Sequence, residues 1–309
     1  MDAGRATSVS LMRTVQVLEG LYPLDYAEEW DHPGLIVGDP TWPVSHIYCA
    51  VDPRPDIVGE AIDQGADLLI THHPLFFRPV HEVSGLGFRG SVVNDLVRAR
   101  CGLWVGHTNA DSAVRGVAQA AADRFGLQGS SPLVPLPMSP HDLHAGSDGT
   151  QTGQVGMGRV GTLPVPMRLD DFARLVARVL PHTELGIQVA GHPGDMISKV
   201  AVLPGSGDSM FDQVRACGAD VYVTSDLRHH PATDAYQQAL YEAKIDASWQ
   251  PDQEQARPAL INTPHSAIES LWFDYARTGI PGAVEAATGF RPTISVSRTR
   301  TDPWDFVIR

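Results

Sequence analysis

The chain has 309 residues, which corresponds to two domains of ordinary size or to one large domain. Hydrophobic residues make up 43% of the chain and charged residues 19%, values that argue against a wholly disordered protein. With 36 acidic and 23 basic residues the net charge is −13, which disfavours duplex DNA and anionic membranes as default partners. Nucleic acid is therefore an unlikely ligand.

Cysteine usage and hydropathy bear on the cellular compartment. The three cysteines are widely spaced and form no CxxC pair, so they fit neither a disulfide framework nor a cysteine zinc site. No apolar run approaches the ~18 residues of a membrane-spanning helix, and the N-terminus has no apolar leader. We therefore expect a cytoplasmic protein that does not associate with membranes.

The first 130 residues alternate between helical and strand patterns. Helical stripes lie near residues 11–20, 55–65, 92–97 and 113–125, and short apolar strand patterns lie at 46–52, 67–71 and 102–107. Strand–helix–strand order of this kind predicts right-handed crossovers and an α/β sheet.

A second α/β pattern follows a stretch rich in Pro, Ser and Gly at residues 130–154, which predicts a linker or a long loop. Helical patterns then occur near 170–180, 210–218 and 232–243, and strand patterns occur at 199–203, 220–224 and 259–263. The polar segment 244–258 looks like an insertion. The last predicted elements are a helix from about His265 to Ala276, a shorter helix at 283–288 and a strand at 293–297.

The two α/β patterns share one short similarity. The sequence GADLLIT at residues 65–71 resembles GADVYVT at 218–224, and each follows a helical segment and precedes polar and histidine residues. The match is compatible with duplication of an α/β half. It is equally compatible with the general appearance of any helix–glycine–strand unit.

Two adjacent histidines follow one predicted buried strand. His72 and His73 in THHP come just past the carboxyl end of the strand at 67–71, the edge at which open α/β sheets bind ligands. The pair could supply two imidazoles to a metal ion. Alternatively, one histidine is exposed and the other bonds a loop carbonyl.

The next strand places further polar residues at the same edge of the sheet. In GHTNAD, His107, Asn109 and Asp111 would project into the same crevice, so Asp111 could be a metal ligand and His107 a general acid or base. For Asp111 alone the favoured interpretation is an Asx-type turn that caps a helix starting near Ser112.

Two more histidine motifs lie in the second half. His265 and Glu269 are four residues apart at the start of a helix, so they could share an ion or form an ordinary surface pair. His229 and His230 open another predicted helix, where either could act in proton transfer or simply face solvent.

Two other motifs carry weaker signals. The stretch GSG at residues 205–207 could cradle a small anion through backbone N–H groups, but GxG is common in tight turns. Trp30 and Asp31 in EEWDHPGLIVG are interpreted as residues that order a loop rather than perform chemistry.

The ordered combination of motifs is more specific than any one of them. EEWDHPGLIVGD, ITHHPLFF, GHTNAD, GMGRVG, VAVLPGSGDS, ADVYVTSDLRHHPATDA, INTPHSAIES and TDPWDF span nearly the whole chain. They resemble the dinuclear metal centre protein family, the Ngg-one-interacting-factor-three-like proteins, also named GTP cyclohydrolase 1 type 2 homologues. The resemblance implies an α/β subunit with two similar three-layer lobes, assembled as a homohexamer.

The resemblance also implies a ligand set for two divalent metal ions per subunit. His72, Asp111 and Glu269 would hold one ion, and His73, His265 and the same Glu269 would hold the second, with Glu269 bridging. Imidazole and carboxylate ligands suit Zn, Fe, Mn, Co or Ni, and the absence of thiolates disfavours a soft-metal site.

Other positions follow the family pattern only in part. His230, the second histidine of RHH, would line the site as a catalytic residue, together with His107. The family commonly has Asp-Ala-Gly before the ligand histidine, whereas this chain has NTP at residues 262–264, which would change the polarity around the ligands.

The same reasoning predicts how the chain divides. Residues 1–130 together with about 270–309 would form the first lobe, 131–154 a loop or linker, and 155–269 the second lobe, so that the end of the chain returns to the first lobe.

Two classes of function remain open from the sequence. The first is a metal-dependent hydrolase in which the ions activate water against a small molecule, possibly a nucleotide, with the GTP cyclohydrolase reaction implied by the resemblance alone. The second is a non-enzymatic metal-carrying or scaffold protein that binds a protein partner. The sequence identifies no guanine pocket.

Overall fold

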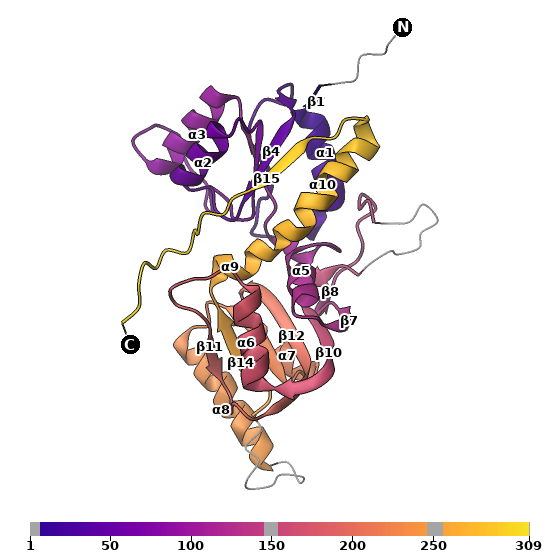
Figure 1. The fold of residues 1–309 in the computed structure, drawn as a ribbon, viewed down its shortest axis with the longest axis vertical. Coiled ribbons are helices and arrows are strands. Elements are labelled where there is room, and N and C mark those ends of the chain that lie inside the picture. Colours follow the sequence, from indigo (N-terminus) through magenta and orange to yellow (C-terminus); the bar gives the residue numbers. More distant parts are fainter. Residues whose placement is uncertain (1–6, 145–153, 246–255, 309) are drawn as a thin grey trace. The chain divides into compact units, whose positions relative to one another are not determined.

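A computed structural model of the chain describes residues 7–144, 154–245 and 256–308 (Figure 1). The chain forms two compact units. The first comprises Met1–Gly116, Met138–Gly153 and Trp272–Thr301, and the second comprises Val117–Pro137, Gln154–Leu271 and Asp302–Arg309. Both are α/β, and the last long helix and the last strand return to the first unit, so the predicted fold class is confirmed. Among the described residues, no helix combines the length and hydropathy needed to cross a membrane.

The sheet of the first unit has five strands. Their order is β15 (Thr293–Val296), β4 (His46–Ala50), β5 (Leu68–Thr71), β6 (Gly102–Val105) and β2 (Gly34–Val37). The first four run parallel and β2 is antiparallel to β6. Every residue of β5 and β6 is buried, as expected for parallel strands that are covered on both faces.

Helices cover both faces of this sheet. Helices α2 (Pro55–Asp63) and α3 (Phe88–Ala99) pack on one face through a core that includes Ile57, Leu69 and Leu96. Helix α1 (Leu11–Leu21) packs with α10 (Phe273–Thr288) on the other face (Figure 1). There Tyr22 lies 6.1 Å from Trp104 of β6, measured between ring centroids.

The first unit also contains four short elements. They are β1 (Val9–Ser10) paired with β3 (Pro43–Val44), the 3-10 helix η1 (Leu24–Tyr26), and α4 (Thr108–Ser112).

The sheet of the second unit has six strands. Their order is β11 (Gln188–Ala190), β14 (Ala259–Thr263), β13 (Val221–Ser225), β12 (Met196–Ser206), β10 (Arg159–Arg168) and β7 (Gln128–Ser131). Strands β12, β13 and β14 are parallel, and the flanking strands are antiparallel to their neighbours. A separate two-stranded sheet joins β8 (Val134–Pro135) to β9 (Gly156–Met157).

Helices also cover both faces of the second sheet. Helices α7 (Phe211–Ala216) and α8 (His229–Ile245) pack on one face around Tyr222 and Leu260. On the other face lie α5 (Val117–Arg124) and α6 (Leu169–Val179), where Phe125 and Phe172 make an edge-to-face contact at 6.1 Å. Strand β14 leads into α9 (His265–Glu269) and the 3-10 helix η2 (Ser270–Trp272).

The short sequence similarity corresponds to a structural repeat. Asp67 accepts hydrogen bonds from the backbone N–H groups of Ser45 and His46 at 2.8 and 3.0 Å. Asp220 does the same for Ser198 and Lys199 at 2.8 and 2.9 Å. In each unit, therefore, a carboxylate just before one parallel strand, β5 or β13, binds backbone N–H groups near the start of the preceding parallel strand, β4 or β12.

The repeat extends well beyond these two carboxylates. Apart from the short elements η1 and β3, the order α1–β2–β4–α2–β5–α3–β6–α4 in the first half matches α6–β11–β12–α7–β13–α8–β14–α9 in the second. The segments that follow are exchanged, because α5 and β7 join the second unit whereas α10 and β15 join the first. The similarity of GADLLIT to GADVYVT thus reflects more than a common helix–glycine–strand pattern.

Three segments differ from the structure predicted for them or lie partly outside the residues that the structure describes. The predicted linker at 130–154 begins with β7 and β8, and its residues 145–153 lie outside the described chain. Most of the predicted insertion at 244–258 also lies outside it, at 246–255. The predicted helix from His265 is interrupted by η2, and α10 then runs on to Thr288 with Pro281 inside it.

We predict that Asp67→Ala and Asp220→Ala each lower the free energy of unfolding by about 1–3 kcal/mol. Each substitution leaves two strand N–H groups without their carboxylate acceptor. Chemical denaturation monitored by circular dichroism measures the change. Asp63→Ala, at an exposed position at the end of α2, is the matched control and should stay within about 0.5 kcal/mol of the wild type. Equal effects of all three substitutions would contradict the role of the two carboxylates.

Candidate metal centre

Two adjacent histidines lie just after β5, the middle strand of the first unit. His72 and His73 directly follow β5, as the sequence predicts, and their ring centroids are 5.1 Å apart. The His72 side chain is wholly buried, and that of His73 is partly exposed.

Hydrogen bonds orient both imidazoles. Nδ1 of His72 lies 2.8 Å from the carbonyl oxygen of Gly106, and Nδ1 of His73 lies 2.6 Å from Oδ1 of Asp52. A carbonyl and a carboxylate can only accept, so each Nδ1 carries the proton. In the neutral ring the lone pair then resides on Nε2, the arrangement found in histidines that bind metal ions.

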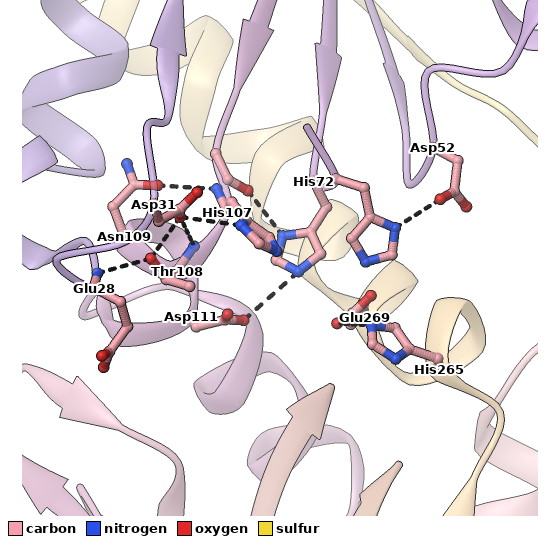
Figure 2. A network of polar contacts seen from close by, with 12 residues as sticks. Glu28, Asp31, Asp52, His72, His107, Thr108, Asn109, Asp111, His265 and Glu269 are labelled. Atoms are coloured by element: carbon pink, nitrogen blue, oxygen red, sulfur yellow. Dashed lines mark hydrogen bonds and ion pairs between the residues drawn. The ribbon is translucent and has the colours of Figure 1, made fainter. Parts of the chain in front are cut away.

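The segment after β6 brings two further groups to this edge. His107 contributes a ring nitrogen that lies within 4.8 Å of those of His72 and His73, so these three form a group able to hold a metal ion. Asp111, on the one-turn helix α4, places Oδ1 3.7 Å from Nε2 of His72 (Figure 2). The helix begins at Thr108, earlier than the expected start near Ser112.

Asp31 holds His107 in place. Its Oδ2 atom lies 3.0 Å from Nδ1 of His107 and accepts hydrogen bonds from the backbone N–H and the hydroxyl of Thr108, at 3.1 and 2.6 Å (Figure 2). Burial alone would raise the pKa of Asp31, but the bonds from His107 and Thr108 outweigh it and lower the pKa to about 2. The loop-ordering role expected for Asp31 therefore includes a contact with an imidazole of the metal-capable group.

Asn109 was expected to project into the same crevice as His107 and Asp111, but its side chain is bonded to the backbone instead. Its side chain is fully buried, accepting the His107 N–H at 2.9 Å and donating to the carbonyl oxygen of Tyr22 at 2.8 Å. It fixes the backbone of the loop, and its amide is committed to these bonds.

The second unit carries a histidine–carboxylate pair on α9. Nε2 of His265 lies 2.9 Å from Oε1 of Glu269, one turn further along the helix, and Nδ1 lies 2.7 Å from Oδ2 of Asp226. Burial favours the neutral ring and lowers the pKa of His265, but the carboxylates of Glu269 and Asp226 outweigh it and raise the pKa to about 11. The surroundings of this imidazole thus strongly favour positive charge, which a proton or a metal ion could supply.

A glycine lets the backbone approach Glu269. Gly205, near the end of β12, has a φ of 81°, and a Cβ atom there would lie 2.9 Å from Oε1 of Glu269. The carbonyl oxygen of Gly205 accepts the Thr224 hydroxyl at 3.0 Å, and that of Gly207 accepts the Tyr222 hydroxyl at 2.9 Å. In this structure, therefore, the GSG stretch makes room for a carboxylate.

His230 occupies a different setting. It lies exposed in the first turn of α8, with its ring centroid 5.2 Å from that of His229. The three-histidine group of the first unit and the pair on α9 do not include it.

Sequence reasoning missed two of the groups that orient imidazoles. Asp52 follows β4 and Asp226 follows β13, so both occupy the carboxyl end of a parallel strand, as His72 and His73 do. Their positions after predicted strands could have identified them. Asp226 also has a left-handed backbone, with a φ of 52°.

The chemistry of these groups fits a divalent cation. Imidazole nitrogens turned outward by Nδ1 hydrogen bonds, together with buried or partly buried carboxylates, suit Zn, Fe, Mn, Co or Ni ions. The described residues of the first unit therefore include a three-histidine cluster able to hold a metal ion, and those of the second include the pair His265 and Glu269.

Comparison with known proteins finds one family over nearly the whole chain. The family model described as Duf34/NIF3 (NGG1p interacting factor 3) matches residues 9–303. The chain is 38% identical to the GTP cyclohydrolase 1 type 2 homolog of Streptomyces coelicolor, covering 95% of this chain and 93% of that protein. It is 29% identical to the Mycobacterium leprae protein of the same name, covering 98% and 97%.

Solved structures show the same fold. A Bacillus cereus protein related to NIF3 superposes with a TM-score of 0.81 at 23% identity, covering 98% of this chain and all of that one. Staphylococcus aureus protein SA1388 gives a TM-score of 0.79 at 24% identity, covering 97% and 99%. With a family match over nearly its whole length, the chain belongs to the Duf34/NIF3 family.

Proposed function

We propose that the protein binds two divalent metal ions and is a metal-dependent hydrolase that acts on a small molecule. The observation that carries the proposal is the group of His72, His73 and His107, whose ring nitrogens gather within 4.8 Å. When bound, paired ions of this kind activate water and stabilise developing negative charge. The GTP cyclohydrolase label of the relatives supports a nucleotide or related heterocycle as the class of substrate.

The proposed ligands come from both units. His72 and Asp111 with Glu269 would hold one ion, and His73 and His265 with the same Glu269 would hold the other. His107, oriented by Asp31, would be the proton-transfer group or an additional imidazole ligand.

Chain connectivity supports the inclusion of Glu269. The ring of Trp272, which belongs to the first unit, lies 5.9 Å from the ring of His72. Glu269 precedes Trp272 by three residues, a length of chain that spans at most about 11 Å when fully extended. This short connection supports including Glu269 in the proposed ligand set.

The charge of a buried carboxylate supports the same assignment. Glu269 is only 2% exposed, and a buried carboxylate is stable only beside compensating positive charge or donors. Between two divalent ions it would be compensated from both sides.

We expect Glu269→Gln to lose most of both ions and His265→Ala to lose chiefly one. Neutralising the bridging carboxylate would leave about four positive charges balanced by Asp111 alone, whereas removing one imidazole affects one ion. His230→Ala should keep both ions and alter only turnover. Elemental analysis of untagged protein gives the metal content per subunit, with circular dichroism as the control for folding. Two retained ions in Glu269→Gln would contradict the bridge, and complete loss in His230→Ala would make His230 a ligand.

We also expect Asp52→Asn to weaken metal binding by about 10–100-fold without unfolding the protein. The substitution removes the carboxylate that holds Nδ1 of His73. Titration of metal-free protein with Zn²⁺ or Mn²⁺ against a chelator measures the affinity, and Asp63→Asn on the exposed end of α2 is the matched control. An affinity equal to that of the control would show that Asp52 does not orient a ligand.

The hydrolase part of the proposal has its own test. Metal-reconstituted wild-type protein is screened against nucleotides, phosphoesters and cyclic amides, with Glu269→Gln in parallel. Turnover that depends on added metal and disappears in Glu269→Gln would support the proposal. Stably bound ions with no turnover on any of these classes would favour a metal-carrying or scaffold role instead.

A further inference from the structure

Two large aromatic side chains are exposed beside the histidine group of the first unit. Trp30 is 53% exposed and Phe77 is 60% exposed, although their ring centroids are only 5.4 Å apart. The ring of His107 lies 5.8 Å from that of Trp30 and 6.3 Å from that of Phe77. Each of these aromatic residues could bury far more apolar area than it does here.

Trp30 is fixed on the same framework as His107. The neighbouring Asp31 accepts both hydrogen bonds from Thr108, and the backbone N–H of Glu28 donates to the Thr108 hydroxyl at 2.9 Å (Figure 2). Three bonds thus join the loop carrying Trp30 to the start of α4. The indole is exposed on a loop that these hydrogen bonds restrain, so little conformational entropy would be lost when it contacts a ligand.

Phe77 is fixed on the segment that carries the other two histidines. It follows His73 by four residues, and its neighbour Phe76 packs against the core beneath α2 and α3. The guanidinium of Arg89, on α3, donates to the carbonyl oxygen of Leu75 at 2.8 Å and so links the segment before Phe77 to that helix. Both exposed rings are therefore built onto the segments that position candidate metal ligands.

A cavity of about 280 Å³ adjoins Phe77. Its lining residues are Phe76, Phe77, Arg78, Pro79, Val80 and Arg89. The two charged residues in this lining are both arginines, in a chain whose net charge is −13. A local pair of guanidinium groups beside aromatic rings suits a ligand that is flat and also anionic.

We propose that Trp30 and Phe77 form a stacking subsite for the planar heterocycle of an anionic substrate, with Arg78 beside the anionic group. The chemical class that combines these features is a nucleoside monophosphate or a larger nucleotide. The subsite rests on the proposed function for its role, because it would hold the substrate ring next to the metal-capable histidines. The rings are inclined at 40° to each other, so a ligand ring stacks on one of them and packs against the edge of the other.

The proposal is tested by calorimetry on the full chain with two probes, GMP and ribose 5-phosphate. In Trp30→Ala and in Phe77→Ala the affinity for GMP should fall by about tenfold, whereas that for ribose 5-phosphate, which lacks the base, should not change. Trp30→Phe keeps an aromatic face and should stay close to the wild type. Arg78→Ala should weaken both probes. Trp304→Ala removes another exposed tryptophan, 57% exposed and part of the second unit, and is the matched control.

Each outcome decides the assignment. Equal GMP affinity in the wild type and Trp30→Ala, or no GMP binding by the wild type at millimolar concentration, would overturn the subsite. So would a change of oligomeric state in Trp30→Ala and Phe77→Ala with GMP affinity retained, because the rings would then form an interface between copies of the chain. Metal content is measured on the same samples: retained ions without GMP binding reject the subsite alone, whereas a wild type that never binds metal rejects the proposed function.

Discussion

The contacts that four Nδ1 atoms make, three hydrogen bonds and one close approach to a carboxylate, determine what the histidines of this protein can do. His72, His73 and His265 each place Nδ1 within 2.8 Å of an oxygen that only accepts, and His107 lies 3.0 Å from Asp31. Each contact fixes a ring plane and, in the neutral ring, leaves Nε2 as the electron-pair donor. Without them the imidazoles would rotate or change tautomer, and proximity alone would not make a ligand set. The oxygens in turn depend on the sheets, since Gly106 and Asp226 directly follow a parallel strand and Asp52 follows one by two residues.

The sheets bring these residues together because parallel strands end at one edge. Within the first unit, Ala50, Thr71 and Val105 end β4, β5 and β6 in register. The residues just beyond them, among them Asp52, His72 and Gly106, therefore reach that edge although they are far apart in the sequence. This placement follows the general rule for ligand sites in open α/β sheets. It also explains why both exposed aromatic rings lie where they do, since Phe77 continues the chain beyond β5 and the Trp30 loop is bonded to the helix after β6.

Much of this could be predicted from the sequence, and the failures have physical causes. Strands such as β5 and β14 are short apolar runs between a glycine or polar turn and a histidine motif, and they were predicted to within a residue. Strands β2, β10 and β11 were not predicted, because they are antiparallel edge or near-edge strands whose residues are only partly buried. Helix α4 has five residues, too few to show a helical period, whereas the start of α9 at His265 was predicted and its interruption by η2 was not. A separate helix at 283–288 was predicted, yet α10 runs through Pro281 to Thr288, with Phe273 and Val284 buried toward its two ends.

The repeat places different side chains at equivalent positions of the two units. In both units a five-residue helix begins six residues after the first residue of the third parallel strand, from Gly102 to Thr108 and from Ala259 to His265. The framework carboxylates Asp67 and Asp220 have the same role in each. The residues that follow the matching stretches GADLLIT and GADVYVT differ, with His72 and His73 in the first unit and Ser225 and Asp226 in the second. Identical halves would supply the same donors twice, whereas a centre with one shared carboxylate needs unequal contributions. The differences between the halves therefore fall at the strand ends, where side chains can change without disturbing the sheet beneath them.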